Sequence, residues 1–269
     1  MTDFSGYLIC SDIDGTISVD TVTVPENIHA IKYFTKNGGR FTIATGRTAA
    51  YLKRLDFFDC INAPACICNG SVVYDYKKEE IVFVNSIDSE NAEALRNIYR
   101  MNAPLSMELY SVDHKAYVLT PDKRSIEHFR GLEIPDYTVI TEISEEIFPL
   151  VKVMLSVGER TAEVQNNLSN TEMMNMCFIP CDGPFVEILS KEAGKGKALH
   201  QLARFYGFDK NNVYAVGDGS NDTDMLMAAE IGFVPENGSV LAKKVADKTV
   251  CSSDDGAVAG VIAYLDTVY

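Results

Sequence analysis

The segment Tyr7-Leu8-Ile9-Cys10-Ser11-Asp12-Ile13-Asp14-Gly15-Thr16 decides the fold. Its first four residues are apolar and predict a short buried strand, and two carboxylates follow at the point where that strand ends. Charges in this position have two explanations. Either the pair caps a tight turn, since Asp-Gly is a common turn dipeptide, or it holds a cation and attacks an electrophile. The rest of the chain decides between these two interpretations.

The composition excludes several classes of protein. The 269 residues carry a formal charge of −14, with 46% hydrophobic and 23% charged residues. No apolar run approaches the about 20 residues of a membrane span, and no signal peptide is visible, so we expect a cytoplasmic protein without a membrane partner. A nucleic-acid partner needs a basic face, which we do not find in this acidic chain. A small phosphorylated substrate remains compatible with the charge if a metal and a few local cations offset the repulsion.

The seven cysteines do not form a recognisable disulfide framework, and we interpret them as mostly buried, reduced thiols. A zinc site of Cys60, Cys66 and Cys68 is disfavoured, because one-residue spacing inside an apolar run suits tetrahedral ligation poorly.

The outer parts of the chain alternate strand and helix patterns. A helix beginning at Pro25 leads to an apolar run over 40–44, and a helix over about 197–206 leads to a second run over 213–216. Alternation of this kind is typical of a parallel sheet covered on both faces. The sequence therefore predicts an α/β fold with a Rossmann-like, doubly wound parallel sheet.

The middle of the chain has a different pattern. From about 86 to 187, a helix followed by two strands recurs three times, which predicts an antiparallel sheet with helices on one face. We therefore expect a catalytic core of residues 1–85 and 188–269, with an α/β domain of residues 86–187 inserted into it.

Four polar clusters occur at the turns of the predicted core. They are Asp12 to Thr16, Thr45-Gly46-Arg47, Lys195-Gly196 and Gly217 to Asp222. Because the carboxyl ends of parallel strands share one edge of a sheet, these clusters should meet there. The carboxylates suit Mg²⁺, while a lysine and the N–H groups of glycine turns suit phosphate oxygens. The combination favours phosphoryl transfer.

A carboxylate is the best candidate for the nucleophile. The four histidines lie away from the clusters, so a hydroxyl nucleophile would lack its usual base. An aspartate with an unperturbed pKa of about 4 is ionised at neutral pH and can attack phosphorus, forming an aspartyl-phosphate. A second carboxylate can protonate the leaving oxygen and later activate water. Asp12 and Asp14 fit these two roles.

The order of the motifs resembles that of haloacid dehalogenase superfamily phosphatases of the Cof type. The motifs are DIDGT from Asp12, ATGR from Ala44, GKGKAL from Gly194 and GDGSND from Gly217, and the resemblance spans nearly the whole chain. It implies that Asp12 is the nucleophile and that Asp14 is the acid/base and a metal ligand through its main-chain carbonyl. For the rest of the site it implies a catalytic Lys195, phosphate or substrate contacts from Ile13, Thr45, Gly46, Arg47 and Asn221, and Mg²⁺ ligands Asp12, Asp14, Asp218 and Asp222.

The inserted segment resembles the α/β cap of that group, which sets substrate specificity. Asn69-Gly70 also matches the asparagine-glycine pair that precedes the cap in the family. The chain departs from the family at Pro235 to Ser239, where members often carry Gly-Asn-Ala. Substrate contacts are therefore not carried over to that stretch.

Three residue assignments involve a choice. We prefer Lys195 to Lys197, because Lys195 precedes Gly196 at the turn whereas Lys197 begins the helix surface. Asp224 is interpreted as a residue favoured by the dipole at a helix N-terminus rather than as a metal ligand. Arg47 either binds substrate or forms a structural salt bridge, and the sequence leaves both possibilities open.

The sequence thus predicts a Mg²⁺-dependent phosphatase for small phosphorylated metabolites, with sugar phosphates favoured by the resemblance. One alternative is a phosphotransferase or phosphomutase, in which a second hydroxyl accepts the phosphoryl group. Another is a regulatory ligand-binding protein with little turnover. We expect a monomer or a homodimer.

Overall fold

The computed structural model divides into two compact units. The core unit comprises Met1–Phe83 and Gly194–Tyr269, and the inserted unit comprises Val84–Ala193. The structure describes residues 2–20, 22–132, 134, 136–180 and 184–268. The boundary expected at 187 falls inside a strand that continues to Ser190, so the second boundary of the inserted unit lies further along the chain.

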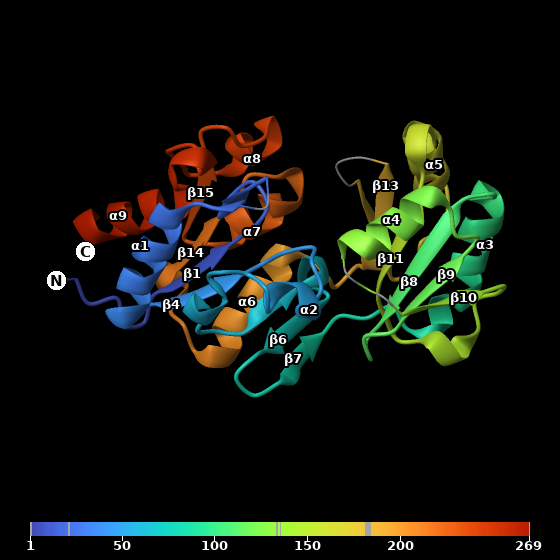
Figure 1. Ribbon diagram of the computed structural model, residues 1–269, viewed down its shortest axis with the longest axis horizontal. Helices are drawn as coiled ribbons and strands as arrows, with labels where there is room; N and C mark the ends of the chain where they lie inside the picture. The colour runs from blue at the N-terminus through green and yellow to red at the C-terminus, as the bar shows by residue number, and fades with distance from the viewer. Residues whose placement is uncertain (1, 21, 133, 135, 181–183, 269) are drawn as a thin grey trace. The chain divides into compact units, whose positions relative to one another are not determined.

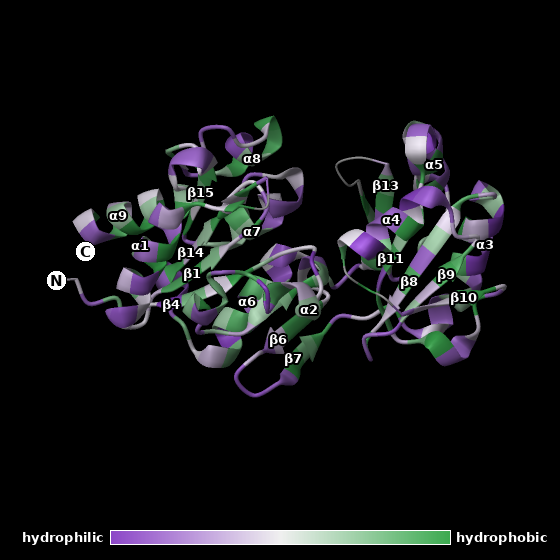
Figure 2. Ribbon diagram, viewed as in Figure 1, coloured by the Kyte–Doolittle hydropathy of each residue, from purple (hydrophilic) through white to green (hydrophobic). Residues whose placement is uncertain are grey.

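The core unit is built on a five-stranded parallel sheet of order β16-β15-β14-β1-β4 (Figure 1). Every residue of β1 and β14 is buried, because helices cover both faces of the sheet. In Figure 2 these central strands carry the hydrophobic colour. The arrangement confirms the predicted α/β class. The strands are β1 (Leu8–Ser11), β4 (Arg40–Ile43), β14 (Val213–Val216), β15 (Ile231–Pro235) and β16 (Lys248–Val250).

Different pairs of helices cover the two faces of this sheet. On one face, α6 (Lys195–Tyr206) and α7 (Thr223–Ala228) pack against the strand residues that include Leu8 and Ala215. On the other face, α9 (Ala257–Val268) contacts α1 (Pro25–Lys36), and the ring of Tyr264 lies 5.5 Å from that of Phe233. The remaining α-helices of the core unit are α2 (Ala49–Leu52) and α8 (Val240–Val245).

Two small sheets flank the parallel sheet. A hairpin of β2 (Ser18–Val19) and β3 (Val22–Thr23) directly follows the Asp12 loop. A three-stranded sheet contains β5 (Ala65–Ile67), β6 (Val72–Asp75) and β7 (Glu80–Val84). Short 3-10 helices lie at Phe58–Cys60, Cys68–Gly70, Ser89–Asn91, Glu145–Ile147, Gly158–Arg160, Lys210–Asn212, Ser220–Asp222 and Ser253–Asp255.

The inserted unit contains a six-stranded sheet of order β10-β9-β8-β11-β13-β12. Helices α3 (Ala92–Asn102) and α5 (Thr161–Ser169) pack on one face, where Leu95 and Val164 join a hydrophobic core. The third helix is α4 (Lys123–Gly131). The strands are β8 (Ser106–Ser111), β9 (Ala116–Leu119), β10 (Tyr137–Ile140), β11 (Leu150–Ser156), β12 (Met176–Pro180) and β13 (Phe185–Ser190).

Two details of the inserted unit differ from the expected antiparallel sheet with helices on one face. β10 pairs with β9 in parallel, because α4 crosses over between them. α4 also packs on the face opposite to α3 and α5 (Figure 1). Side chains of β8 alternate between faces, so Leu109 joins the core under α3, whereas Tyr110 meets Phe129 of α4 at 6.0 Å between ring centroids.

Within the described residues, every helix is too short or too polar to span a membrane. No disulfide joins the described cysteines, and Cys10, Cys60, Cys66 and Cys68 are buried.

Candidate active site

The loop after β1 folds back tightly on itself. The N–H of Asp12 donates to the carbonyl of Val216 at 2.9 Å, which ties the start of the loop to the end of β14. The carbonyl of Ile13 accepts from the N–H groups of Thr16, Ile17 and Ser18 at 3.2, 3.0 and 2.9 Å. Because the Ile13 side chain is buried, a phosphate contact from this residue would have to use its backbone. The carboxylate of Asp12 is held at the end of the central strands.

Gly15 allows the Asp12 loop and the Asp218 loop to approach one another. Its φ of +86° is unfavourable for a side chain, and a Cβ there would lie 2.5 Å from Oδ2 of Asp218. The next residue fixes the same carboxylate, since Oγ1 of Thr16 donates to Oδ1 of Asp218 at 2.8 Å. Thr16 is not among the site residues predicted from the sequence, although it belongs to the DIDGT motif.

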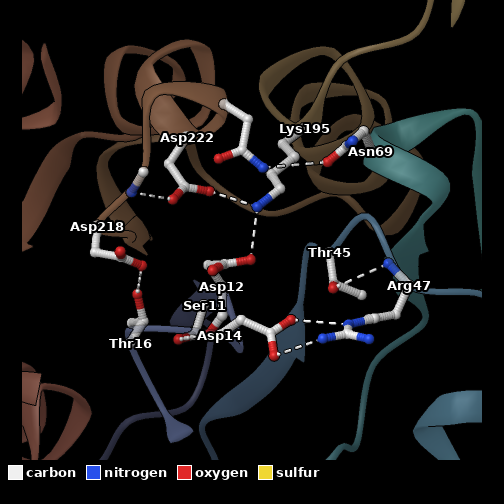
Figure 3. A network of polar contacts seen from close by, with 12 residues as sticks. Ser11, Asp12, Asp14, Thr16, Thr45, Arg47, Asn69, Lys195, Asp218 and Asp222 are labelled. Carbon is white, nitrogen blue, oxygen red and sulfur yellow. Dashed lines mark hydrogen bonds and ion pairs between the residues drawn. The ribbon is translucent and has the colours of Figure 1, made fainter. Parts of the chain in front are cut away.

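Lys195 is the first residue of α6 and is fully buried between two carboxylates. Its Nζ donates to Oδ1 of Asp12 at 2.6 Å and to Oδ1 of Asp222 at 2.5 Å (Figure 3). The second oxygen of Asp222 accepts from the N–H of Gly219 at 2.8 Å. Lys197 is exposed, so the side chain that reaches the carboxylates is that of Lys195.

Burial and charge shift the ionisation of this cluster. Burial raises the pKa of Asp12 to about 8, although Lys195 acts in the opposite direction. Burial also raises the pKa of Asp218. For Lys195, burial lowers the pKa, but the carboxylates of Asp12 and Asp222 outweigh it and raise the pKa overall. The expectation of an unperturbed Asp12 therefore does not hold for the cluster by itself, and a bound cation would favour the ionised form of Asp12.

Three carboxylates could bind a metal ion that supplies such a positive charge. Asp12, Asp218 and Asp222 each offer one oxygen, and these oxygens all lie within 4.8 Å of one another. An all-oxygen set with more negative charge than Lys195 can balance fits a divalent cation of the Mg²⁺ type. The side chain of Asp14 lies outside this set, so its expected contribution through the main-chain carbonyl stays a prediction.

Asp224 is not one of the three carboxylates that could bind a metal ion, and its side chain makes a structural hydrogen bond instead. Its Oδ2 accepts from the N–H of Gly196 at 2.9 Å, which joins the start of α7 to the first turn of α6. The contact anchors the turn that carries Lys195.

The segment after β4 forms the opposite side of the site. Oγ1 of Thr45 accepts from the N–H of Arg47 at 3.2 Å. The guanidinium of Arg47 forms a bidentate ion pair with the carboxylate of Asp14, at 3.0 and 3.1 Å (Figure 3). Arg47 thus makes a salt bridge, one of the two possibilities that the sequence left open.

Asn69 links the remaining expected residues. Its N–H donates to the carbonyl of Thr45 at 2.8 Å, and its Oδ1 accepts from Nδ2 of Asn221 at 3.4 Å. A Cβ on Gly46 would lie 3.2 Å from the side-chain nitrogen Nδ2 of Asn69. The sequence identifies Asn69 only as the residue before the insertion and does not place it among the site residues. Its position between two of the polar clusters is visible only in the folded chain.

Comparisons with known proteins agree with this geometry. A model of the haloacid dehalogenase-like hydrolase family matches residues 9–262. Among curated relatives, the 5-amino-6-(5-phospho-D-ribitylamino)uracil phosphatase YwtE of Bacillus subtilis is 25% identical, over 96% of this chain and 97% of its own length. The phosphoglycolate phosphatase of Methanopyrus kandleri is 26% identical, over 96% of this chain and 95% of its own length.

Solved structures share the fold across both units. The sugar phosphatase BT4131 of haloacid dehalogenase subclass IIB superposes with a TM-score of 0.84 at 19% identity, covering 97% of this chain and 100% of the other. TM0651 from Thermotoga maritima gives 0.80 at 23% identity, covering 96% and 97%. The family match contains all four polar clusters and confirms the resemblance seen in the motifs. This chain belongs to the haloacid dehalogenase-like hydrolase family.

Proposed function

We propose that this protein is a Mg²⁺-dependent phosphatase that hydrolyses small phosphorylated metabolites through an aspartyl-phosphate on Asp12. The observation that carries the proposal is the buried contact of Lys195 with Asp12 and Asp222, next to Asp218. Burying a lysine with two carboxylates, beside the partly buried Asp218, costs desolvation energy that a residue with only a structural role would not require. They are the groups that a phosphoryl-transfer site requires. The phosphatase names of the relatives YwtE and phosphoglycolate phosphatase add support.

In the first step, an oxygen of Asp12 forms a bond to phosphorus while the bond from phosphorus to the ester oxygen breaks. The leaving oxygen takes a proton from Asp14, which would enter this step protonated and leave it as the carboxylate that Arg47 contacts. Lys195 balances charge on Asp12 and on the phosphoryl oxygens, and Thr45 and Asn221 would hold those oxygens through their polar side chains.

In the second step, water attacks phosphorus and releases Asp12 as a carboxylate. Asp14, ionised after the first step, accepts the proton of the attacking water, and inorganic phosphate leaves. Asp12, Asp218 and Asp222, with the main-chain carbonyl of Asp14, would hold Mg²⁺, which supplies positive charge that offsets the negative charge of the substrate and the carboxylates. Asp222 would also orient Lys195 through their contact.

The substrate class is the finer part of the proposal. We favour sugar phosphates, because BT4131, whose fold this chain shares, is described as a sugar phosphatase. The inserted unit would act as the cap that selects the leaving group. We keep a cytoplasmic location and a monomeric or homodimeric state as further predictions.

The proposal is tested by phosphate release from p-nitrophenyl phosphate and from a panel of sugar phosphates, with Mg²⁺ and with EDTA. We expect release by the wild type with Mg²⁺ only, and none by Asp12→Asn that keeps its circular dichroism spectrum. Acid quenching during turnover should trap radioactive phosphate on the wild-type protein. Absence of both phosphate release and phosphoenzyme would refute the mechanism.

The same assay separates the two alternatives. Sugar acceptors are added, and phosphorylated products are measured beside inorganic phosphate. Transfer that exceeds hydrolysis would identify a phosphotransferase or mutase. Tight binding of a phosphorylated ligand with no turnover would identify a regulatory protein.

A further inference from the structure

Arg47 and Asp14 form a bidentate ion pair inside the core unit. Nε of Arg47 lies 3.0 Å from Oδ2 of Asp14, and Nη2 lies 3.1 Å from Oδ1 (Figure 3). A guanidinium presents two N–H groups at the spacing of the two oxygens of a carboxylate. In the described part of the chain, Arg47 is the one side chain that hydrogen-bonds to the Asp14 carboxylate. The pair therefore sets the orientation of this carboxylate.

Arg47 is itself held in place by its neighbours. Its guanidinium carbon lies 4.5 Å from the ring centroid of Tyr51, a cation–π contact. Its N–H donates to Oγ1 of Thr45 at 3.2 Å, and its carbonyl accepts from the N–H of Cys68 at 3.0 Å. The backbone and the tip of the side chain are both restrained, so the guanidinium is a fixed support for Asp14.

The ion pair of Arg47 and Asp14 is partly exposed to solvent. The side chains of Arg47 and Asp14 are 30% and 42% exposed, and ion pairs in contact with water are worth little because solvent and salt screen them. Both residues nevertheless lie beside the candidate nucleophile, in the loops after β1 and β4. A restrained pair at this position suits orientation of a reacting group better than it suits stabilisation of the fold.

We infer that Arg47 is a positioning residue for the second half of the reaction. It holds Asp14 as the carboxylate that accepts the proton of the water attacking the aspartyl-phosphate. This inference rests on the proposed function. In that step the water oxygen bonds to phosphorus, the bond from phosphorus to Asp12 breaks, and the proton passes to Asp14. The bidentate pair supports this role by its geometry, because the two N–H groups of Arg47 fix the plane and the direction of the Asp14 carboxylate.

A role in phosphate binding would have a different kinetic effect. If Arg47 held the phosphate of the substrate, its loss would raise KM and would leave less phosphoenzyme. If Arg47 positions Asp14 for hydrolysis of the intermediate, its loss slows dephosphorylation, so phosphoenzyme accumulates. kcat should then become the same for esters with good and poor leaving groups, because their common intermediate limits the rate.

The experiment measures kcat, KM and the steady-state fraction of acid-trapped phosphoenzyme for full-length wild type, Arg47→Ala and Arg47→Lys with Mg²⁺. The substrates are p-nitrophenyl phosphate and glucose 6-phosphate. We expect kcat of Arg47→Ala to fall by about 10-fold or more, with a several-fold higher phosphoenzyme fraction. Arg47→Lys keeps the charge but not the bidentate geometry, and it should also accumulate phosphoenzyme.

Two controls make the result specific. Lys53→Ala removes an exposed cation from the same segment, where Lys53 pairs with Glu79, and it should leave the phosphoenzyme fraction unchanged. In an Asp14→Asn background, Arg47→Ala should have no further effect on dephosphorylation, since the group that it positions is already lost.

The outcomes separate this inference from the proposed function. A wild type that forms phosphoenzyme, beside an Arg47→Ala variant with an unchanged or lower phosphoenzyme fraction and a raised KM, overturns the positioning role alone. A wild type that forms no phosphoenzyme and releases no phosphate overturns the proposed function, and the positioning role with it. The inference is supported if phosphoenzyme accumulates in both Arg47 variants and if Arg47→Ala causes no further accumulation when Asp14 is already replaced by asparagine.

Discussion

At the residue scale, Lys195 is the centre of the candidate site. Its Nζ lies 2.6 Å from Asp12 and 2.5 Å from Asp222, and its side chain is fully buried. The three side chains come from the loop after β1, the first turn of α6 and the loop after β14. A single ammonium thus holds together the ends of three segments that are far apart in the sequence, and it reduces the repulsion between two buried carboxylates.

Replacement of Lys195 by methionine should therefore damage stability as well as activity. Lys195→Met keeps the volume of the side chain but leaves Asp12 and Asp222 without their cation, which should lower the free energy of unfolding by about 3–5 kcal/mol. Urea unfolding at pH 9 in EDTA, where Asp12 and Asp222 are both ionised in the wild type, measures this loss. The matched control is Lys197→Met, on the exposed side of the same helix turn, which should change stability by less than about 0.5 kcal/mol. Equal stability of the two variants would contradict the assigned role.

The raised pKa of Asp12 predicts how stability depends on pH. Its pKa is about 8 in the folded chain and about 4 when unfolded, so the neutral form stabilises the fold. This contribution is fully present below about pH 4 and is lost as the pH rises through about 8. Asp12→Asn stays neutral at every pH and does not lose this contribution. The difference in urea midpoint between the variant and the wild type, both measured in EDTA, should therefore increase in favour of the variant from pH 5 to pH 8. A constant or falling difference would show that Asp12 is ionised throughout.

Some residues of the site could be predicted from the sequence, and others could not. Three of the four clusters could be selected because they follow buried strands of a parallel sheet, whose carboxyl ends meet, and Lys195-Gly196 because it precedes a predicted helix of the same core. Thr16 and Asn69 were missed as site residues, because a threonine after Gly15 and an asparagine in a turn are ordinary turn residues when taken alone. Their contacts with Asp218 and Asn221 join positions more than a hundred residues apart, and no local pattern encodes such pairs.

At the element scale, the first turn of α6 sets the position of Lys195. The N–H of Gly196 donates to Asp224 at 2.9 Å, and a Cβ on Gly196 would lie 2.2 Å from the carbonyl oxygen of Asp224. α6 therefore approaches α7 more closely than any side chain at this position would allow. The contact requires glycine, whereas the sequence alone explained Gly196 only as part of a turn.

A methyl group at Gly196 should push the two helices apart. Overpacking of this kind typically costs about 1–3 kcal/mol, so Gly196→Ala should unfold at lower urea and should lose activity as Lys195 moves. Gly131→Ala is the control, because a Cβ on Gly131, at the end of α4, meets no atom within 4 Å. That variant should be as stable as wild type or more stable. Wild-type activity in Gly196→Ala would show that the helix contact does not position the lysine.

The elements of the core were predictable where periodicity is strong. The helix expected from Pro25 and the runs at 40–44 and 213–216 correspond to α1, β4 and β14. α4 shows why the inserted unit was less predictable. Its pattern identifies a helix, but the face of the sheet that it covers depends on the crossover from β9 to the parallel β10, which is a tertiary choice. Helix periodicity gives the buried side of a helix and not the partner that buries it.

At the scale of the whole molecule, every expected site residue belongs to the core unit, whose two segments flank the inserted unit in sequence. The carboxylates of the ion set come from both segments: Asp12 from the first, and Asp218 and Asp222 from the second. An ion that binds them links the two segments of the chain. Its stabilising effect should therefore be confined to one unit, in contrast to a nonspecific effect of salt.

Hydrogen exchange with and without Mg²⁺ tests this consequence. A ligand at a hundred times its Kd stabilises the state that binds it by about 2.7 kcal/mol, so amides of the core unit that open locally should exchange more slowly. We expect the gain around 12–16, 195–199 and 217–222, with little change over 84–193, and none in Asp218→Asn. KCl at the same ionic strength controls for screening. An equal gain in both units, or a gain that survives in Asp218→Asn, would show that Mg²⁺ acts elsewhere than on these carboxylates.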